Sequence, residues 1–255
     1  PEPGGSHAVN HQIGQGQDVA ARQSQYPVGD EGDKEEPKPD EDENVTGTLA
    51  FEDIWPSGGD YDMNDVIVEY ERKVYFDKKN IVTKIVDEFT PVHDGATYVN
   101  AFAYQIDAAQ IGDKITLPEG AILEKATSSI IVMSNAKQNI GNKYVVTREF
   151  NGSFLKNQLL SYNPYIIVKY SQGEQNRTEV HLPKHKATAY ANQSLIGSND
   201  DAYYIDRKGA YPFAIDIPML GFTPVTERNR IDSQYPGFAT WAKSMGNDCK
   251  DWYKK

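Results

Sequence analysis

The feature that most constrains the fold is a series of short segments in which apolar and polar residues alternate. In residues 64–77, Val66 and Val68 fall on one face of an extended chain, and Glu69 and Glu71 fall on the other. Similar segments, separated by turns rich in Gly, Pro and Asn, cover residues 81–89, 97–106, 121–133, 143–150, 165–170 and 213–217. Many short strands and few helical patterns predict a mainly β fold, an antiparallel β-sandwich of the jelly-roll type.

A helical pattern replaces this alternation near the C-terminus. After Pro236, the apolar residues Phe238, Trp241 and Met245 recur at helical spacing, and Gly246 can end the helix. We expect this aromatic stripe to pack on the core. Two further short helices are predicted, at residues 107–111 and near residues 154–160.

The charge of the chain is concentrated in one segment. The 255 residues have a net charge of −11, and residues 29–44, with nine acidic residues and two lysines, contribute −7 of it. The rest is nearly neutral and carries no basic footprint for a nucleic acid. We therefore predict an N-terminal arm and acidic linker over residues 1–45 and a β-sandwich domain over residues 46–255.

Several absences narrow the class of protein. Cys249 is the only cysteine, so an internal disulfide framework is excluded. No stretch of about 18 apolar residues predicts a transmembrane segment. The chain opens with PEPGGSHAVNHQ, and we expect it to be a mature or excised piece of a longer exported protein.

The segment FEDIWPSGGDYDMNDVIVEY, residues 51–70, contains the strongest chemical signal. Asp60, Asp62, Asn64 and Asp65 place four oxygen-bearing side chains within six residues. Calcium prefers such oxygen ligands, and alternate spacing on a curved backbone can direct them at one ion. The alternative is a solvated turn, because Asp and Asn also bond to their own backbone.

An EF-hand does not explain this loop. With Asp60 at position 1, Glu71 would stand at position 12, but Asp65 occupies position 6, where the EF-hand needs glycine. The strand that follows would also carry Glu71 too far away to close the site. The remaining ligands must come from elsewhere, and Glu52 and Asp53 are the nearest candidates.

Motifs for catalysis are mostly absent. The sequence contains no nucleophile elbow, P-loop or dinucleotide fingerprint. The acidic residues between 52 and 65 could supply the carboxylate pair of a hydrolase. Catalytic pairs usually come from different parts of a fold, so five carboxylates this close together suit a cation better, and we expect no enzymatic activity.

Several stretches together resemble the LruC-type domains of exported bacterial surface proteins. The string GTLAFEDIWPSGGDYDMND, residues 47–65, resembles the opening of these domains. Further similar stretches are residues 96–103 (ATYVNAFA), 181–183 (HLP), 211–218 (YPFAIDIP), 235–246 (YPGFATWAKSMG) and 251–253 (DWY). The resemblance covers most of residues 47–253.

The resemblance implies an exported module without catalytic activity. Such domains are often attached to outer-membrane or secreted lipoproteins and are sometimes described as adhesins, which implies the outer-membrane surface, the periplasm or secretion in a Gram-negative bacterium. Related D-x-D-x-N-D loops in exported proteins are usually interpreted as calcium sites, and Asp60, Asp62, Asn64 and Asp65 match that motif. The further acidic residues Asp200, Asp201 and Glu227 could complete a site across the fold.

The first hypothesis for function is therefore a calcium-stabilised, monomeric surface module that adheres to, or binds, a protein or glycan. The second is a carbohydrate-binding module in which Trp55 and Tyr61, beside the acidic loop, stack on a sugar ring; they could equally pack under the loop. The third is a carboxylate-dependent hydrolase.

Overall fold

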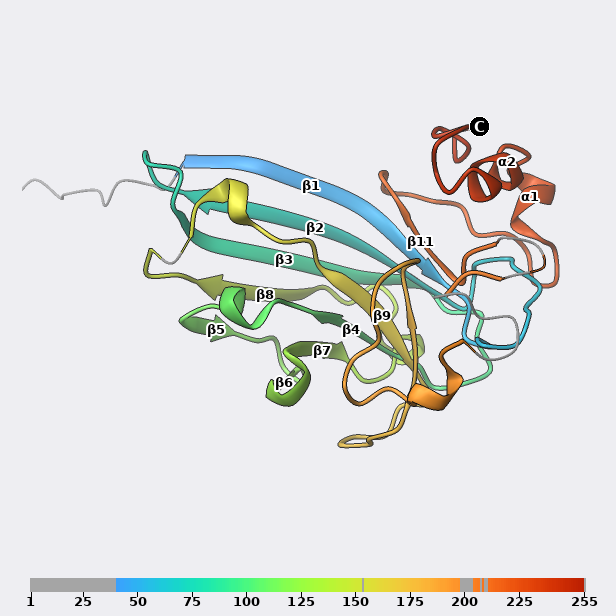
Figure 1. Cartoon of the computed structure of the whole chain (residues 1–255), viewed down its shortest axis with the longest axis horizontal. Helices are drawn as coiled ribbons and strands as arrows, with labels where there is room; N and C mark the ends of the chain where they lie inside the picture. The colour runs from blue at the N-terminus through green and yellow to red at the C-terminus, as the bar shows by residue number, and fades with distance from the viewer. Residues whose placement is uncertain (1–39, 153, 198–203, 207, 209–210, 255) are drawn as a thin grey trace, which may run out of the picture. The chain divides into compact units, whose positions relative to one another are not determined.

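Two antiparallel β-sheets share one core in the computed structural model of the chain (Figure 1). The structure describes residues 40–152, 154–197, 204–206, 208 and 211–254, with side chains from residue 43 onward. The larger sheet, in the order β11-β1-β2-β3-β8-β5, consists of β1 (Asp40–Phe51), β2 (Val66–Phe76), β3 (Val82–His93), β5 (Lys114–Thr116), β8 (Tyr144–Glu149) and β11 (Ala214–Ile217). The smaller sheet, in the order β10-β9-β4-β7-β6, consists of β4 (Ala101–Gln105), β6 (Ile122–Glu124), β7 (Ser129–Met133), β9 (Asn163–Val168) and β10 (Thr178–His181). The predicted β-sandwich is confirmed.

The hairpin between β2 and β3 forms where the alternation predicts it. The Asp77 carboxylate accepts hydrogen bonds from the backbone N–H groups of Lys79, at 2.8 Å, and Ile81, at 2.9 Å. Asn80 has a φ of 61°, in the left-handed region that Asn tolerates. The turn therefore follows from local side-chain chemistry.

The single strand predicted over residues 121–133 is wrong. Residues 121–133 form β6 and β7, separated by the 3₁₀ turn η2 (Lys125–Thr127), and Ser128 reverses the chain with a φ of 53°. The two halves pair with each other, Ile122 opposite Ile131. Alternation cannot distinguish one long strand from a hairpin made of the same residues, and it also misses β5 and β10, which are too short to show a period.

Strand β1 begins inside the acidic run. It starts at Asp40, six residues before the predicted start of the sandwich at residue 46. The reason is strand pairing. β2 extends to Phe76, which lies opposite Asp40, so the β1–β2 hydrogen-bond ladder continues into the acidic run. Residues 1–39 of the arm and linker predicted over residues 1–45 lie outside the described residues.

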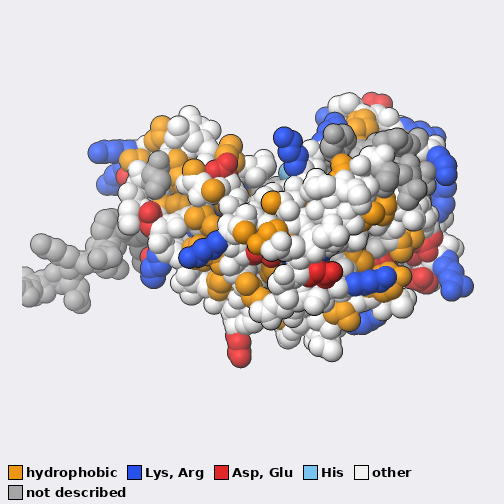
Figure 2. Space-filling view, turned by 60° about the horizontal axis from the view of Figure 1, so that its bottom comes forward, with side chains coloured by type: hydrophobic (Ala, Val, Ile, Leu, Met, Phe, Trp, Pro, Cys, Tyr) orange, Lys and Arg blue, Asp and Glu red, His pale blue; other side chains and the backbone are white. Residues whose placement is uncertain are grey.

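In residues 40–254, so far as the structure describes them, helical structure is confined to short segments. The elements are η1 (Ala108–Gln110), η3 (Lys137–Asn139), η4 (Lys156–Gln158), η5 (Gln193–Leu195), α1 (Ile231–Gln234) and α2 (Phe238–Lys243). Phe238 is fully buried with its ring 4.8 Å from that of Trp252, and Trp241 is partly buried against the core, so the two aromatic residues of the predicted stripe pack on the core. Met245 does not, because it lies beyond the end of α2 and is 46 % exposed. In the described part of the chain, none of the helices has the length and apolarity to cross a membrane. Figure 2 shows basic and acidic side chains interspersed on one face.

A charged cluster lies between the sheets. The Asp87 carboxylate, on β3, is 1 % exposed and accepts hydrogen bonds from the Tyr162 hydroxyl at 2.6 Å and the Tyr104 hydroxyl at 3.3 Å. The guanidinium groups of Arg72 and Arg148 each lie 3.3 Å from it. Arg148 has no exposed surface, so its charge depends on this carboxylate for compensation.

We predict that Asp87→Asn lowers the free energy of unfolding by about 3–5 kcal/mol, because it leaves the buried Arg148 charge without its counter-ion. Urea denaturation at pH 7 measures this loss. The neighbouring variant Glu88→Gln is the control, since it removes only a partly exposed ion pair with Lys143, and we expect a change below about 1 kcal/mol. Equal losses in the two variants would contradict the assigned role of Asp87.

Candidate metal centre

The candidate site is the loop over residues 52–65, which connects β1 to β2 in the larger sheet. Its backbone is tightly curved, because Tyr61 and Met63 have φ values of 55° and 54°, in the left-handed region that few non-glycine residues adopt. Both side chains are buried in the core, and Tyr61 packs 5.5 Å from the ring of Phe213. This packing stabilises the unusual backbone.

Three carboxylates converge in this loop. One oxygen each from Glu52, Asp60 and Asp62 lies within 4.8 Å of the other two. Ligands at 2.3–2.6 Å from one calcium ion have such mutual distances. Glu52 and Asp62 are 0 % and 2 % exposed, and Asp60 is the most exposed of the three.

Two buried oxygens of the loop lack a hydrogen-bond donor. They are Oε2 of Glu52 and Oδ1 of Asn64. Their partner atoms are engaged, since Glu52 Oε1 accepts a hydrogen bond of 2.6 Å from the backbone N–H of Met63 and Asn64 Nδ2 donates one of 3.1 Å to the carbonyl of Val225. Buried acceptors without donors are uncommon and call for an ion or a water.

Glycines keep space beside both of these oxygens. A Cβ atom at Gly59 would lie 2.7 Å from Glu52 Oε2, and a Cβ atom at Gly95 would lie 2.6 Å from Asn64 Oδ1. Both distances are shorter than a van der Waals contact. Glycine at these two positions therefore leaves the unpaired oxygens accessible to a small ligand such as a cation.

The electrostatics of the loop disfavour its charged form without an ion. Burial and then repulsion from Asp65 raise the pKa of Glu52 well above its usual value. Burial and then Asp60 raise the pKa of Asp62 to about 6, and burial and then Asp53 raise the pKa of Asp65 to about 7. A bound cation would reverse these shifts, because it attracts every carboxylate.

Asp53 and Asp65 flank the three converging carboxylates and bond to protein groups. Asp65 Oδ2 accepts a hydrogen bond of 2.7 Å from the backbone N–H of Asp53, whose own Oδ2 accepts one of 2.8 Å from Asn100. Burial raises the pKa of Asp53. These two carboxylates are placed to orient the site and to add negative charge beside it.

Residues 227 and 228, far from the loop in the sequence, also approach it. The backbone N–H of Arg228 donates a 3.0 Å hydrogen bond to Asp62 Oδ2, and Glu227 contributes to the raised pKa of Asp62. Glu227 therefore lies near the loop. Asp200 and Asp201, the other candidate distal ligands, lie outside the described residues.

The two aromatic residues beside the loop are buried under it. Trp55 is 3 % exposed and its ring lies 4.7 Å from that of Tyr204, while Tyr61 is 7 % exposed. Neither ring therefore offers a free face for a sugar, and both rings pack under the loop.

Sequence reasoning missed the residues that complete this site. Gly95 and the backbone of Arg228 belong to no recognisable motif, and Gly59 and Asn100, although they lie in stretches of the LruC-type resemblance, carry no carboxylate that marks them as part of the site. The side chain of Asp94 also has no exposed surface, although its Oδ1 lies 3.6 Å from Lys137 Nζ, and burial raises its pKa. Apart from Gly59, which belongs to the loop, only the fold brings these residues to it.

Comparisons with known proteins identify a family and a fold. The model of a family described as "Domain of unknown function (DUF4842)" matches residues 80–253. A solved structure described as a "Putative lipoprotein from Bacteroides ovatus" has a TM-score of 0.63 and 18 % sequence identity, and the match covers 83 % of this chain and 74 % of that one. No curated protein matches the chain in sequence. The matched family is DUF4842, and the LruC-type resemblance stays a prediction.

We predict that the metal-free protein loses stability as the pH rises from about 4 to about 7.5. The pKa values of Asp62 and Asp65 rise from 3.8 in the unfolded chain to about 6 and about 7 in the fold. The folded state therefore binds more protons, so deprotonation through this range favours unfolding. The melting temperature in EDTA should fall by several degrees, and calcium should remove the fall. A melting temperature in EDTA that rises throughout would contradict this electrostatic description.

Proposed function

We propose that this chain, which belongs to the family described as a domain of unknown function (DUF4842), is a non-enzymatic, surface-exposed or secreted binding module whose β-sandwich is stabilised by calcium in the loop over residues 52–65. One observation carries the calcium assignment. Three carboxylates converge within 4.8 Å, and the loop holds two buried oxygens without a donor, one of them Oε2 of Glu52 itself. A bound cation would satisfy oxygens that the hydrogen bonds of the loop leave unsatisfied.

The donor atoms favour calcium over other metals. Glu52, Asp60, Asp62 and Asn64 offer oxygen only, which suits hard cations and not zinc or copper. Calcium accepts six to eight oxygens in flexible geometry, whereas magnesium demands a near-ideal octahedron. An irregular loop that carries both carboxylates and an amide matches the more tolerant ion.

A calcium ion here would be structural, because the loop connects separate parts of the sandwich. Glu52 follows β1, and its backbone N–H donates a 2.9 Å hydrogen bond to Phe213, next to β11. The carbonyl of Tyr61 accepts a 2.8 Å hydrogen bond from the N–H of Ile231, the first residue of α1. Ion binding would hold these segments together and add its binding free energy to folding.

The burial of the carboxylates argues against the hydrolase hypothesis. Glu52 and Asp62 are almost inaccessible to a substrate. The carboxyl groups of glycoside hydrolases are usually about 5–9.5 Å apart, with the scissile bond between them. Oxygens within 4.8 Å of one another suit a small cation better than a scissile bond between them.

The surface role has separate support. The fold resembles that of a protein described as a lipoprotein, and the residues of the LruC-type resemblance lie in the same domain. Adhesion or ligand binding by a calcium-stabilised monomer is consistent with both. Because Trp55 and Tyr61 are buried, any glycan would have to bind away from the acidic loop.

We predict that millimolar calcium raises the melting temperature by about 5–10 °C. A ligand at 100 times its Kd adds about 2.7 kcal/mol, and each kcal/mol corresponds to about 2–4 °C in a domain of this size. The variant Glu52→Gln keeps an oxygen for the Met63 N–H but loses a carboxylate. It should lose most of the calcium response and, in EDTA, melt at or above the temperature of the wild type, because a repelling charge is gone.

Glu119→Gln is the matched control, since Glu119 is exposed and far from the loop in sequence; it should respond to calcium as the wild type does. Differential scanning calorimetry gives the melting temperatures, and isothermal titration with calcium chloride gives the affinity. Equal calcium responses in wild type and Glu52→Gln would assign the ion to another site. No heat and no shift in the wild type would reject calcium.

A further inference from the structure

Two adjoining cavities form a groove whose lining contains none of the residues of the acidic loop. Their volumes are about 290 and 320 Å³, and both are lined by Leu182, His185 and Asp216. Because these three residues line both cavities, the cavities lie side by side, and we call the two together the Asp216 groove. It runs from the end of α2 to the inner face of β1 and β2.

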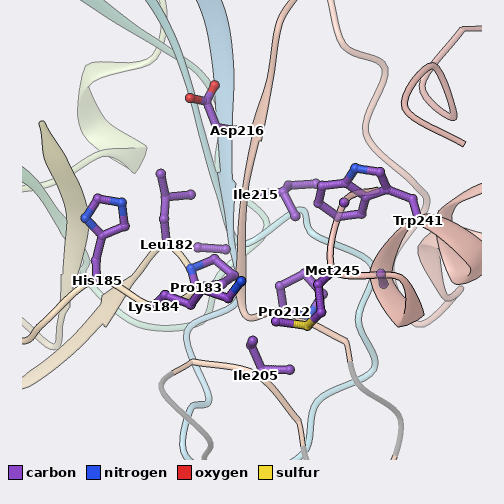
Figure 3. Close-up of a pocket in the computed structure, with 13 residues that line it drawn as sticks. Leu182, Pro183, Lys184, His185, Ile205, Pro212, Ile215, Asp216, Trp241 and Met245 are labelled. Atoms are coloured by element: carbon purple, nitrogen blue, oxygen red, sulfur yellow. The ribbon is translucent and has the colours of Figure 1, made fainter. Parts of the chain in front are cut away.

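The first part of the groove lies between the turn at residues 182–185 and the end of helix α2. Figure 3 shows His185 and Leu182 on one side and Trp241 and Met245 on the other, with Asp216 at one end. Trp241 is fixed from behind, since its ring lies 5.5 Å from the rings of both Phe238 and Trp252. This part therefore has a rigid aromatic wall.

The second part of the groove depends on a glycine. The Tyr70 hydroxyl donates a hydrogen bond to Asp216 that spans 3.0 Å to Oδ1 and 3.2 Å to Oδ2. To reach Asp216, the Tyr70 ring crosses β1 at Gly47, where a Cβ atom would lie 2.6 Å from the Tyr70 hydroxyl. Any side chain at Gly47 would displace Tyr70 and change the shape of the groove.

The charges that line the groove are largely compensated. Arg72 pairs with Asp87 at 3.3 Å, and Glu71 pairs with Lys73 at 3.1 Å. Burial and the neighbouring His181 lower the pKa of His185, which is therefore neutral at pH 7.

Lys184 and Asp216 are the exceptions among these groups, since neither forms an ion pair among the residues that the structure describes, and their opposite charges balance. Asp216 is exposed in the groove. Its carboxylate keeps acceptor capacity beyond the bond from Tyr70, so it can accept hydrogen bonds from a ligand.

Aromatic surface lies at one end of the groove, where Trp241 lines the part beside α2. Tyr162, at the other end, is covered on its two faces by Tyr104, with ring centres 5.0 Å apart, and by the Arg72 guanidinium, 3.0 Å from the ring centre. Aromatic faces bind the apolar C–H faces of sugar rings, while carboxylate, imidazole and phenol groups hydrogen-bond to hydroxyls. A groove with Trp241, these polar groups and little net charge suits a ligand that is neutral, rich in hydroxyls and longer than one ring.

We propose that the Asp216 groove binds a neutral oligosaccharide, with Asp216 accepting hydrogen bonds from sugar hydroxyls. This assignment rests on the proposed function as a surface binding module and supplies its ligand class. It differs from the loop-centred carbohydrate hypothesis, because the calcium loop contributes no contact to the sugar.

The test is isothermal titration of the calcium-loaded protein with neutral hexasaccharides of glucose, mannose, xylose and galactose. Polygalacturonate and an unstructured peptide are tested beside them. We expect at least one neutral hexasaccharide to bind and Asp216→Asn to weaken it by about tenfold or more, since hydrogen bonds to a charged acceptor are lost. The control Asp251→Asn removes an exposed carboxylate outside the groove and should bind as the wild type does.

Other outcomes overturn the proposal. Failure of every neutral hexasaccharide to bind, binding only of polygalacturonate or the peptide, or equal affinity in wild type and Asp216→Asn would each reject it. The calcium-dependent rise in melting temperature, measured on the same samples, separates this failure from failure of the proposed calcium site. It also shows that each variant is folded.

Discussion

Mutual repulsion among buried carboxylates is the constraint around which one end of the sandwich is organised. Glu52, Asp60 and Asp62 are brought together because Tyr61 and Met63, between and beside them, are buried in the core. Hydrophobic packing thus forces like charges into proximity. The backbone of the loop also forms hydrogen bonds with Phe213, the residue before β11, and with Ile231, the first residue of α1. Repulsion within the loop therefore weakens the contacts that hold these segments together.

The middle of the sandwich solves a similar problem without an ion. Asp87 is surrounded by two guanidinium groups and two tyrosine hydroxyls, so its charge and both of its oxygens are satisfied by protein groups. The loop has no comparable set of donors within the described residues. This contrast between a satisfied carboxylate and unsatisfied ones is the physical basis for assigning a ligand to the loop and a structural role to Asp87.

The groove follows from the way that the two sheets overlap. Parts of the inner faces of β1 and β2 are not covered by the smaller sheet, and the 182–185 turn and α2 border the space that remains. Because Gly47 has no side chain, the Tyr70 ring can lie across β1 and line the groove. Its hydroxyl then reaches Asp216 on β11. The proposed calcium loop and the proposed ligand groove therefore share no residue.

The sequence by itself determined the fold class, the β2–β3 hairpin and the acidic loop, because each depends on neighbouring residues. Alternation along one strand, the Asp77 turn and the spacing of Asp60, Asp62 and Asn64 are local properties. Only the tertiary structure decided that residues 121–133 reverse direction, that Trp55 and Tyr61 are buried, and that Gly95 and Arg228 approach the loop. It alone also brought Asp216 beside Tyr70, 146 residues away. These features depend on which distant segments pack together, and that choice is made by the burial of the whole core, which no local pattern encodes.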